Sequence, residues 1–264
     1  MSLCGDDVPA ALRISVVIPA WRDADQLARL LPQLATMRGI AETIVVNASR
    51  DSISDRIIRT SGATLLKFSP PNRGGQLNAG AESANGDVLL FQHADTELTE
   101  AHLKALELAL RDPAILGGAF HRKFDRRHPH LIWLEPIARL LSRRGGALYG
   151  DQSIFVRHEV FLRLGGFREI PLMEDVEFSR RMRRAGKIAL LDPPVQTSAR
   201  HHVRKGAWRT TARNVLLTVL YRAGVSPFRL HRWYFPAPEL SRRAPRADRN
   251  AGSPVRKLSG VGEP

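Results

Sequence analysis

The chain has 264 residues, 43% of them hydrophobic and 25% charged, which suits one large domain with a full core. Its 40 Lys and Arg exceed its 26 Asp and Glu by a formal net charge of +14. This surplus either attracts nucleic acid, anionic lipid or a phosphorylated substrate, or is an arginine-rich surface with no specific partner. One cysteine excludes a disulfide framework, and no apolar run approaches the ~20 residues that span a bilayer. We therefore expect a cytoplasmic protein, with contact to the inner membrane face left open.

Short β-branched runs alternate with helical patterns in the first part of the chain. Ile14–Ile18 predicts a buried strand, and the leucines of Asp25–Met37 recur at helical spacing. The alternation continues with strands at Thr43–Val46, Ala63–Phe68 and Val88–Gln92 and helices at Ser54–Thr60 and Gln76–Ser83. This order predicts an α/β fold with a Rossmann-like, mostly parallel mixed sheet flanked by helices.

The regular alternation of strands and helices ends after a predicted helix at Glu100–Leu110. Two further strands are expected at Gly117–Phe124 and Gln152–Arg157, and helices at Glu174–Ala185 and Trp208–Arg222. From Pro236 onward the chain is rich in Pro, Arg, Ser and Gly, which is typical of a disordered basic tail. We therefore divide the chain into an extension (1–12), one domain (13–235) and a tail (236–264).

Polar residues follow four of the predicted strands, where ligands bind in open α/β sheets. These segments are 19–23 (PAWRD), 47–51 (NASRD), 72–78 (NRGGQLN) and 93–96 (HADT). Taken singly, each segment is better explained as a turn or a helix cap. Together they predict a binding edge.

The segment His93-Ala94-Asp95 carries the most chemistry. An aspartate at a strand end offers hard oxygen to Mg²⁺ or Mn²⁺, which neutralises charge on a departing diphosphate. The alternative is that Asp95-Thr96-Glu97 begins the next helix.

Several motifs together resemble the inverting, GT-A-fold glycosyltransferases of family 2. They are SVVIPAWRD, VVNASRDS, RGGQLNAG and LLFQHAD, followed by GDQSIFVR, GGF and PLMEDVEFSRRMRRAG, from about Ile14 to about Val225. The run LLFQHADT, GGAF, GDQ, PLMED and TSAR is similar to the subgroup linked to arsenosugar biosynthesis. The resemblance implies a hexosyltransferase-type enzyme with a GT-A fold, a nucleotide-sugar donor and a divalent cation.

The resemblance also implies roles for single residues. Pro19, Ala20 and Asp23 would hold the nucleoside, with Trp21 beside the base. Arg73 and Gln76 would face the diphosphate or the sugar. Asp95 would bind the metal, and Asp175 would be the catalytic base.

Two positions depart from the family pattern. Asn47 stands where the family usually has an aspartate that accepts the uracil N3–H, so a UDP-sugar remains favoured while other bases become credible. The loss of charge there removes roughly 1 kcal/mol of donor binding. His93 replaces the first aspartate of the Asp-x-Asp motif and is expected to reach the ribose more than the metal.

Asp175 also makes chemical sense as the base. Inverting transfer needs a base within hydrogen-bond reach of the acceptor hydroxyl. Glu174 and Asp175 follow Pro171-Leu172 at a predicted helix start, where the helix dipole stabilises acids without any chemistry. Both interpretations therefore stay open.

Further along, His201 or His202 offers a nitrogen ligand to the metal, although paired histidines in a loop are more often surface residues. The Gln-x-x-Arg-Trp signature of processive synthases is absent, which favours single transfer. The helix Trp208–Arg222 and the aromatics after it either pack on the domain or lie on an anionic membrane.

Two other functions compete with glycosyl transfer. A sugar-1-phosphate nucleotidyltransferase needs a Gly-rich loop after the first strand, and Pro19-Ala20-Trp21-Arg22 contains no glycine. A basic nucleic-acid-binding protein is the non-enzymatic alternative, but no zinc spacing or RNA-recognition signature appears, so no nucleic acid is expected. The acceptor is not specified by the sequence.

Overall fold

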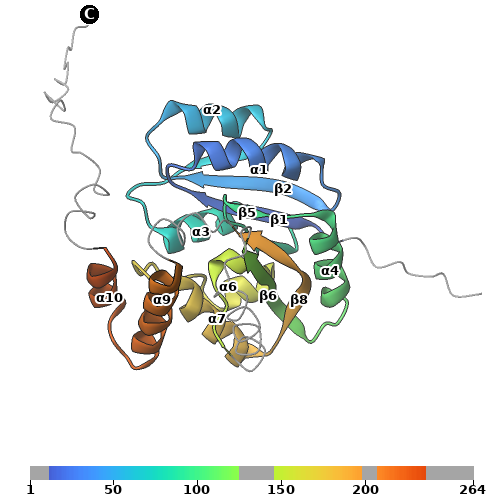
Figure 1. Ribbon diagram of the computed structural model, residues 1–264. Coiled ribbons are helices and arrows are strands. Elements are labelled where there is room, and N and C mark those ends of the chain that lie inside the picture. The colour runs from blue at the N-terminus through green and yellow to red at the C-terminus, as the bar shows by residue number, and fades with distance from the viewer. Residues whose placement is uncertain (1–11, 125–145, 198–206, 236–264) are drawn as a thin grey trace, which may run out of the picture.

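The structure is a computed structural model that describes residues 12–124, 146–197 and 207–235 (Figure 1). Its first part contains β1 (Ile14–Ala20), α1 (Ala24–Thr36), β2 (Ile40–Asn47), α2 (Ser52–Thr60), β3 (Thr64–Lys67), α3 (Arg73–Glu82) and β4 (Val88–Phe91). The rest contains β5 (Thr96–Glu97), α4 (Glu100–Leu110), β6 (Ile115–Phe124), a 3-10 turn (Gly150–Gln152), β7 (Ile154–Arg157), α6 (His158–Arg163), α7 (Glu174–Ala185), β8 (Lys187–Thr197), α9 (Ala207–Arg222) and α10 (Pro227–Tyr234).

The strands form one sheet in the order β3-β2-β1-β4-β7-β6-β8-β5. The first four run parallel, with β1 between β2 and β4. β7 is antiparallel to both β4 and β6, β8 is parallel to β6, and β5 is antiparallel to β8. The predicted mixed α/β sheet flanked by helices is thus confirmed.

Each face of the sheet carries its own core, because successive residues of a strand point to opposite faces. On β1, Ile18 packs into the core that includes leucines of α1 and α4, whereas Val17 packs into the core built from α3, α6 and α7. Figure 1 shows α1 and α2 on one side of β1 and β2, and α3 on the other. Both faces of the parallel strands are therefore covered, and only their ends are left to bind a ligand.

One long strand was not predicted from the sequence. β8 contains Pro193 and Pro194, which cannot donate a ladder hydrogen bond and normally argue against a strand. The structure accommodates them with a break in the β6–β8 register, so that Phe120 pairs with Leu191 and Arg122 with Val195. The helices α6 and α10 were also not predicted.

The helix α3 begins three residues before its predicted start at Gln76. Asn72 caps it, because its Oδ1 accepts the N–H of Gly75 at 2.8 Å. Gly74 lies so close to a neighbouring loop that a Cβ there would be 2.4 Å from the carbonyl oxygen of Arg168. These glycines therefore allow close packing inside a helix, where the sequence suggested a loop.

The expected extension, all but its last residue, and the expected tail lie outside the described residues. Within residues 12–124, 146–197 and 207–235, no helix is long and apolar enough to cross a membrane.

Candidate active site

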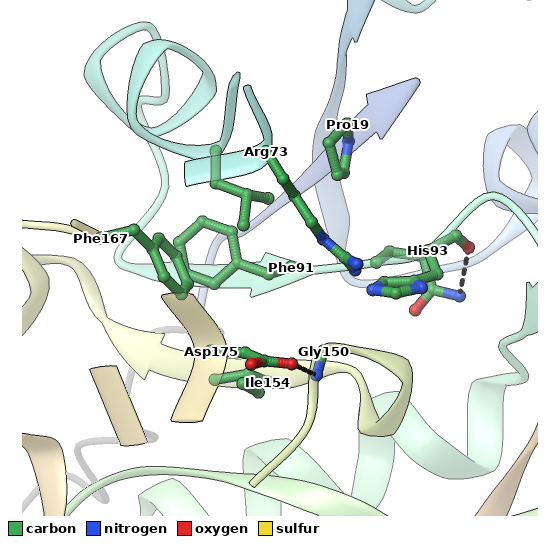
Figure 2. A pocket seen from close by; sticks show the side chains of 10 residues that line it. Pro19, Arg73, Phe91, His93, Gly150, Ile154, Phe167 and Asp175 are labelled. Carbon is green, nitrogen blue, oxygen red and sulfur yellow. Dashed lines mark hydrogen bonds between the residues drawn. The ribbon is translucent and has the colours of Figure 1, made fainter. Parts of the chain in front are cut away.

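The carboxyl ends of β1 and β4 border a small pocket of about 250 Å³, its open mouth included. The chain order reverses between these two strands, which is where open α/β sheets bind ligands. The lining residues are Pro19, Arg73, Leu77, Phe91, Gln92, His93, Gly150, Ile154, Phe167 and Asp175 (Figure 2). Three of the four predicted strand-end segments, 19–23, 72–78 and 93–96, contribute lining residues, and residues from the second half of the chain complete the pocket.

The loop after β1 is held in a specific shape. Arg22 takes a left-handed φ of 61°, and its N–H donates to Ser49 Oγ at 2.6 Å. The N–H of Trp21 donates to Asp23 Oδ2 at 2.8 Å, and burial raises the pKa of Asp23. The Arg22 guanidinium lies 4.7 Å from the Trp21 ring centroid. The loop thus presents an aromatic ring and an acid beside the end of β1.

Asn47, at the end of β2, is fully buried and engaged inside the protein. Its Oδ1 accepts the N–H of Ser49 at 2.9 Å, and its Nδ2 donates to Asp55 Oδ1 at 2.8 Å. Lys67 Nζ lies 2.8 Å from both oxygens of Asp55. Asn47 is also not among the pocket-lining residues, so this arrangement gives it the role of holding the loop after β2.

Gln76 also acts within the scaffold. Its Nε2 donates to the carbonyl oxygens of Ala20 at 3.0 Å and Val46 at 2.8 Å, and the residue is 4% exposed. It therefore joins the ends of β1 and β2, and the pocket lining does not include it.

Arg73, in the first turn of α3, is the cation of the pocket. Its Nε lies 3.4 Å from Glu174 Oε1, and its side chain is 37% exposed. Figure 2 shows the guanidinium directed from α3 toward His93. A cation so placed is suited to an anionic ligand.

Asp175 lies across the pocket from Arg73, at the start of α7. Gly150 N–H donates to its Oδ2 and Val176 N–H to its Oδ1, each at 2.7 Å. Burial is the largest influence on this carboxyl and raises its pKa. For its neighbour Glu174, burial and then the charge of Asp175 raise the pKa to about 7. Asp175 lines the pocket, whereas Glu174 is directed to Arg73.

His93 is a neutral group at the pocket floor. Burial, reinforced by the charge of Arg73, lowers its pKa to about 3. Its Nε2 is buried without a hydrogen-bond partner among the described residues. A Cβ at residue 150 would lie 2.7 Å from that nitrogen and 2.8 Å from Arg73 Nη2, so a side chain there would have to displace both pocket groups.

The sequence model of the family described as Glycosyl transferase family 2 matches residues 15–168, more than half of the chain. The chain belongs to glycosyltransferase family 2. This membership argues against the two alternatives, a nucleotidyltransferase and a nucleic-acid-binding protein. A search of curated protein sequences finds no match for this glycosyltransferase.

Solved structures share the fold at low sequence identity. A mannosyltransferase from Pyrobaculum calidifontis, in complex with GDP-Man and Mn²⁺, is 17% identical, with 89% of this chain and 74% of that one covered at a TM-score of 0.63. S. aureus TarS 1-349 in complex with UDP-GlcNAc is 19% identical, with 72% of this chain and 59% of that one covered at a TM-score of 0.58. Glucosyl-3-phosphoglycerate synthase from Mycobacterium tuberculosis, in complex with Mn²⁺, UDP and glucosyl-3-phosphoglycerate, is 20% identical. The match covers 82% of this chain and 81% of that one at a TM-score of 0.56. The chain covers only 37% of the longer S. aureus TarS chain. The GT-A fold of the glycosyltransferase is confirmed.

Asp95 offers one carboxylate to a cation. It precedes the short strand β5 and does not cap a helix, since α4 begins at Glu100. Its side chain is 44% exposed, with Oδ1 3.8 Å from His93 Nδ1. Burial and then the charges of Asp151 and Asp23 raise the pKa of Asp95, so a cation would relieve repulsion there. The site fits a cation held by one protein carboxylate and by ligand oxygens.

Within the part of the chain that the structure describes, no cluster of three or more His, Cys, Asp or Glu side chains could hold a metal on its own. The candidate ligands His201 and His202 lie outside the described residues.

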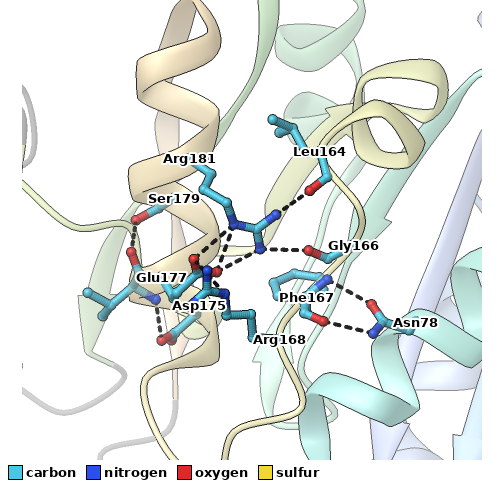
Figure 3. A network of polar contacts seen from close by, with 10 residues as sticks. Asn78, Leu164, Gly166, Phe167, Arg168, Asp175, Glu177, Ser179 and Arg181 are labelled. Carbon is cyan, nitrogen blue, oxygen red and sulfur yellow. Dashed lines mark hydrogen bonds and ion pairs between the residues drawn. The ribbon is translucent and has the colours of Figure 1, made fainter. Parts of the chain in front are cut away.

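Sequence reasoning missed the residues that place Asp175. The loop before α7 is anchored to α3, since Asn78 exchanges two hydrogen bonds with the backbone of Phe167 at 2.9 and 2.8 Å (Figure 3). Arg181 pairs with buried Glu177 and donates to the carbonyl oxygens of Leu164 and Gly166. The motif RGGQLNAG contains Asn78, but its partner lies 89 residues away and leaves no local signal.

Proposed function

We propose that this family 2 glycosyltransferase is an inverting, non-processive enzyme that moves a sugar from a nucleotide-sugar donor to a hydroxyl acceptor, with Asp175 as the base. One observation carries the proposal. The carboxylate of Asp175 lines the same pocket as Arg73, His93 and the end of β1, although it comes from the other half of the chain.

The surroundings of Asp175 support its role as base. The Gly150 N–H fixes the orientation of its carboxylate, and burial raises its pKa toward the working range. A base acts best when its pKa approaches the pH at which it works. In this proposal the acceptor hydroxyl loses its proton to Asp175 as its oxygen attacks the sugar carbon, and the nucleoside diphosphate leaves with the bonding electrons.

The donor would lie along the ends of β1 and β2. Arg73 is the group for the diphosphate, while Pro19, Ala20, Trp21 and Asp23 border the nucleoside. Asn47 and Gln76 support this surface from inside, since their amides are bonded to the protein. A UDP-sugar is the donor to test first, because two of the three structures compared above hold UDP or UDP-GlcNAc.

A divalent cation, Mg²⁺ or Mn²⁺, would be held by Asp95, with His93 beside it and His201 or His202 as a further candidate. Such a cation supplies charge neutralisation for the departing diphosphate. Two of the structures compared above hold Mn²⁺, which supports this part of the proposal. The assignment to the arsenosugar-linked subgroup rests on the sequence runs alone.

The donor is identified first, and the base is tested afterwards. Thermal-shift screening of nucleoside diphosphates and their sugars, with and without Mn²⁺, should give a saturable stabilisation. Asp175→Asn should then slow transfer by at least about a hundredfold while donor affinity changes only a few-fold, because the amide keeps the shape but cannot take the proton. Protonation of Asp175 should lower the wild-type transfer rate at low pH. This fall should be absent in Asp175→Asn, because the amide does not titrate.

Glu174→Gln is the matched control. It removes the neighbouring carboxyl, which contacts Arg73 and does not line the pocket, so its effect on the rate should be milder. Transfer by Asp175→Asn at nearly the wild-type rate would end the assignment of the base.

A further inference from the structure

The helix α9 exposes an apolar stripe. Val215, Leu216 and Val219 are 55%, 55% and 56% exposed. Their spacing of one and four residues puts them on one face of the helix, and the exposed alanines Ala212 and Ala223 continue the same face. Because Leu217 and Thr218 point the other way and are buried, α9 has an apolar side turned inward and another turned outward.

The neighbouring helix α10 carries exposed aromatic rings and positive charge. Phe228 and Trp233 are each 63% exposed, and Arg229 and Arg232 are exposed on the same short helix. The Arg213 guanidinium lies 4.2 Å from the Tyr234 ring centroid and so connects α9 to α10, which stand together at one end of the molecule (Figure 1). We name the α9–α10 surface by its exposed members Val215, Leu216, Val219, Phe228, Arg229, Arg232 and Trp233.

The charge of this segment decides between two occupants. Residues 207–235 contain five arginines and no aspartate or glutamate, in a chain of net charge +14. A second copy of the chain would bring two such basic surfaces together, whereas an anionic bilayer attracts them. Aromatic rings next to arginines on one helix, together with an apolar face on its neighbour, suit the headgroup region of a bilayer.

We propose that the α9–α10 surface docks on the surface of an anionic lipid bilayer. Val215, Leu216 and Val219 enter the headgroup region together with the aromatic rings of α10, while Arg229 and Arg232 contact lipid phosphates.

The docking surface adjoins the pocket through one contact. Thr218, on the inner side of α9, lies with its Oγ1 3.4 Å from the hydroxyl of Tyr149. The next residue, Gly150, holds the Asp175 carboxylate. A bilayer bound to the outer face of α9 would therefore lie one helix away from the loop that positions Asp175. The binding proposal itself does not depend on the transfer reaction.

The test is cosedimentation of the full chain with vesicles. We expect binding to vesicles of equal parts phosphatidylcholine and phosphatidylglycerol, weakened by salt, and none to phosphatidylcholine alone. The double variant Arg229→Gln/Arg232→Gln should bind roughly 25-fold more weakly, because each arginine near an anionic surface contributes about fivefold. Phe228→Ser/Trp233→Ser should also lose binding.

Matched controls lie on two helices away from this surface, α2 and α4 (Figure 1). Arg56→Gln/Arg59→Gln on α2 removes the same charge, and Leu108→Ser on α4 removes an aliphatic side chain that is 62% exposed. Both controls should bind like the wild type, and thermal unfolding shows whether each variant folds. Equal weakening by the controls, or no preference for anionic vesicles, overturns the proposal. So does a stable dimer in sedimentation that Val219→Asp dissociates, since a second copy would then cover this surface.

Discussion

Replacing Asn47 by aspartate restores the residue usual in the family but should destabilise this protein. The wild-type amide donates to Asp55 Oδ1 at 2.8 Å, so Asn47→Asp places two carboxylates face to face at a fully buried position. Charges roughly 4 Å apart repel by about 4 kcal/mol at an effective dielectric constant of about 20. Lys67 lies 2.8 Å from both Asp55 oxygens and offsets part of this repulsion. We expect the free energy of unfolding to fall by about 3 kcal/mol at neutral pH.

Urea unfolding of a double-mutant cycle measures this interaction. The variants are Asn47→Asp, Asp55→Asn and the exchange Asn47→Asp/Asp55→Asn, which restores one amide facing one carboxylate. The exchange should be more stable than the two single changes predict, with a coupling of about 2 kcal/mol. The repulsion raises the pKa of one carboxyl in folded Asn47→Asp, so its destabilisation should shrink as the pH falls and that carboxyl takes a proton. An Asn47→Asp protein as stable as the wild type, or equally destabilised in acid and at neutral pH, would refute this reasoning.

Two further predictions concern Asp95 and Glu174, two carboxyl groups next to the pocket-lining residues His93 and Arg73. Asp95→Ala should change the free energy of unfolding by no more than about 0.5 kcal/mol relative to the wild type, because the Asp95 side chain is 44% exposed. The same variant should lose Mn²⁺-dependent donor binding. Calorimetry that shows wild-type Mn²⁺ binding would remove Asp95 from the metal site. Glu174, whose pKa is raised from 4.5 to about 7, destabilises the fold increasingly as the pH rises through that interval, since the folded protein holds this proton more tightly than the unfolded chain. Glu174→Gln cannot ionise, so its free energy of unfolding relative to the wild type should increase across the same interval; chemical denaturation giving the same difference at both ends of it would contradict this.

The elements that the sequence predicted well are those whose signal is local. β1 and β4 are short apolar runs buried on both faces, and α7 is an amphipathic segment whose predicted and observed bounds agree. The order of these elements was enough to place four strand ends at one edge. Arg73 and His93 line the pocket as the strand-end argument requires.

What the sequence could not predict depends on contacts between different helices and strands. Asn47 was expected to hydrogen-bond a nucleobase, but its side-chain amide donates to Asp55 instead. Only the packing of α2 against β2 brings these two residues together. Gln76 was expected to face the donor, but its amide donates to two backbone carbonyl groups, one on β1 and one on β2. Periodicity carries no information on such pairs, since each residue alone has the composition of a binding loop.

The strand order has a consequence for how the protein is made. β6 lies between β7 and β8, and both of these neighbours come later in the chain. During synthesis β6 therefore has no neighbouring strand to pair with until β7 or β8 has been made, and one edge of β4 stays unpaired until β7 emerges. Unpaired edges of this kind invite aggregation and slow folding, because the pairings they await are distant in sequence. A nascent chain cut short before Gly150 would hold the carboxyl ends of β1 to β4, yet it would expose the β4 edge and lack the loop that orients Asp175.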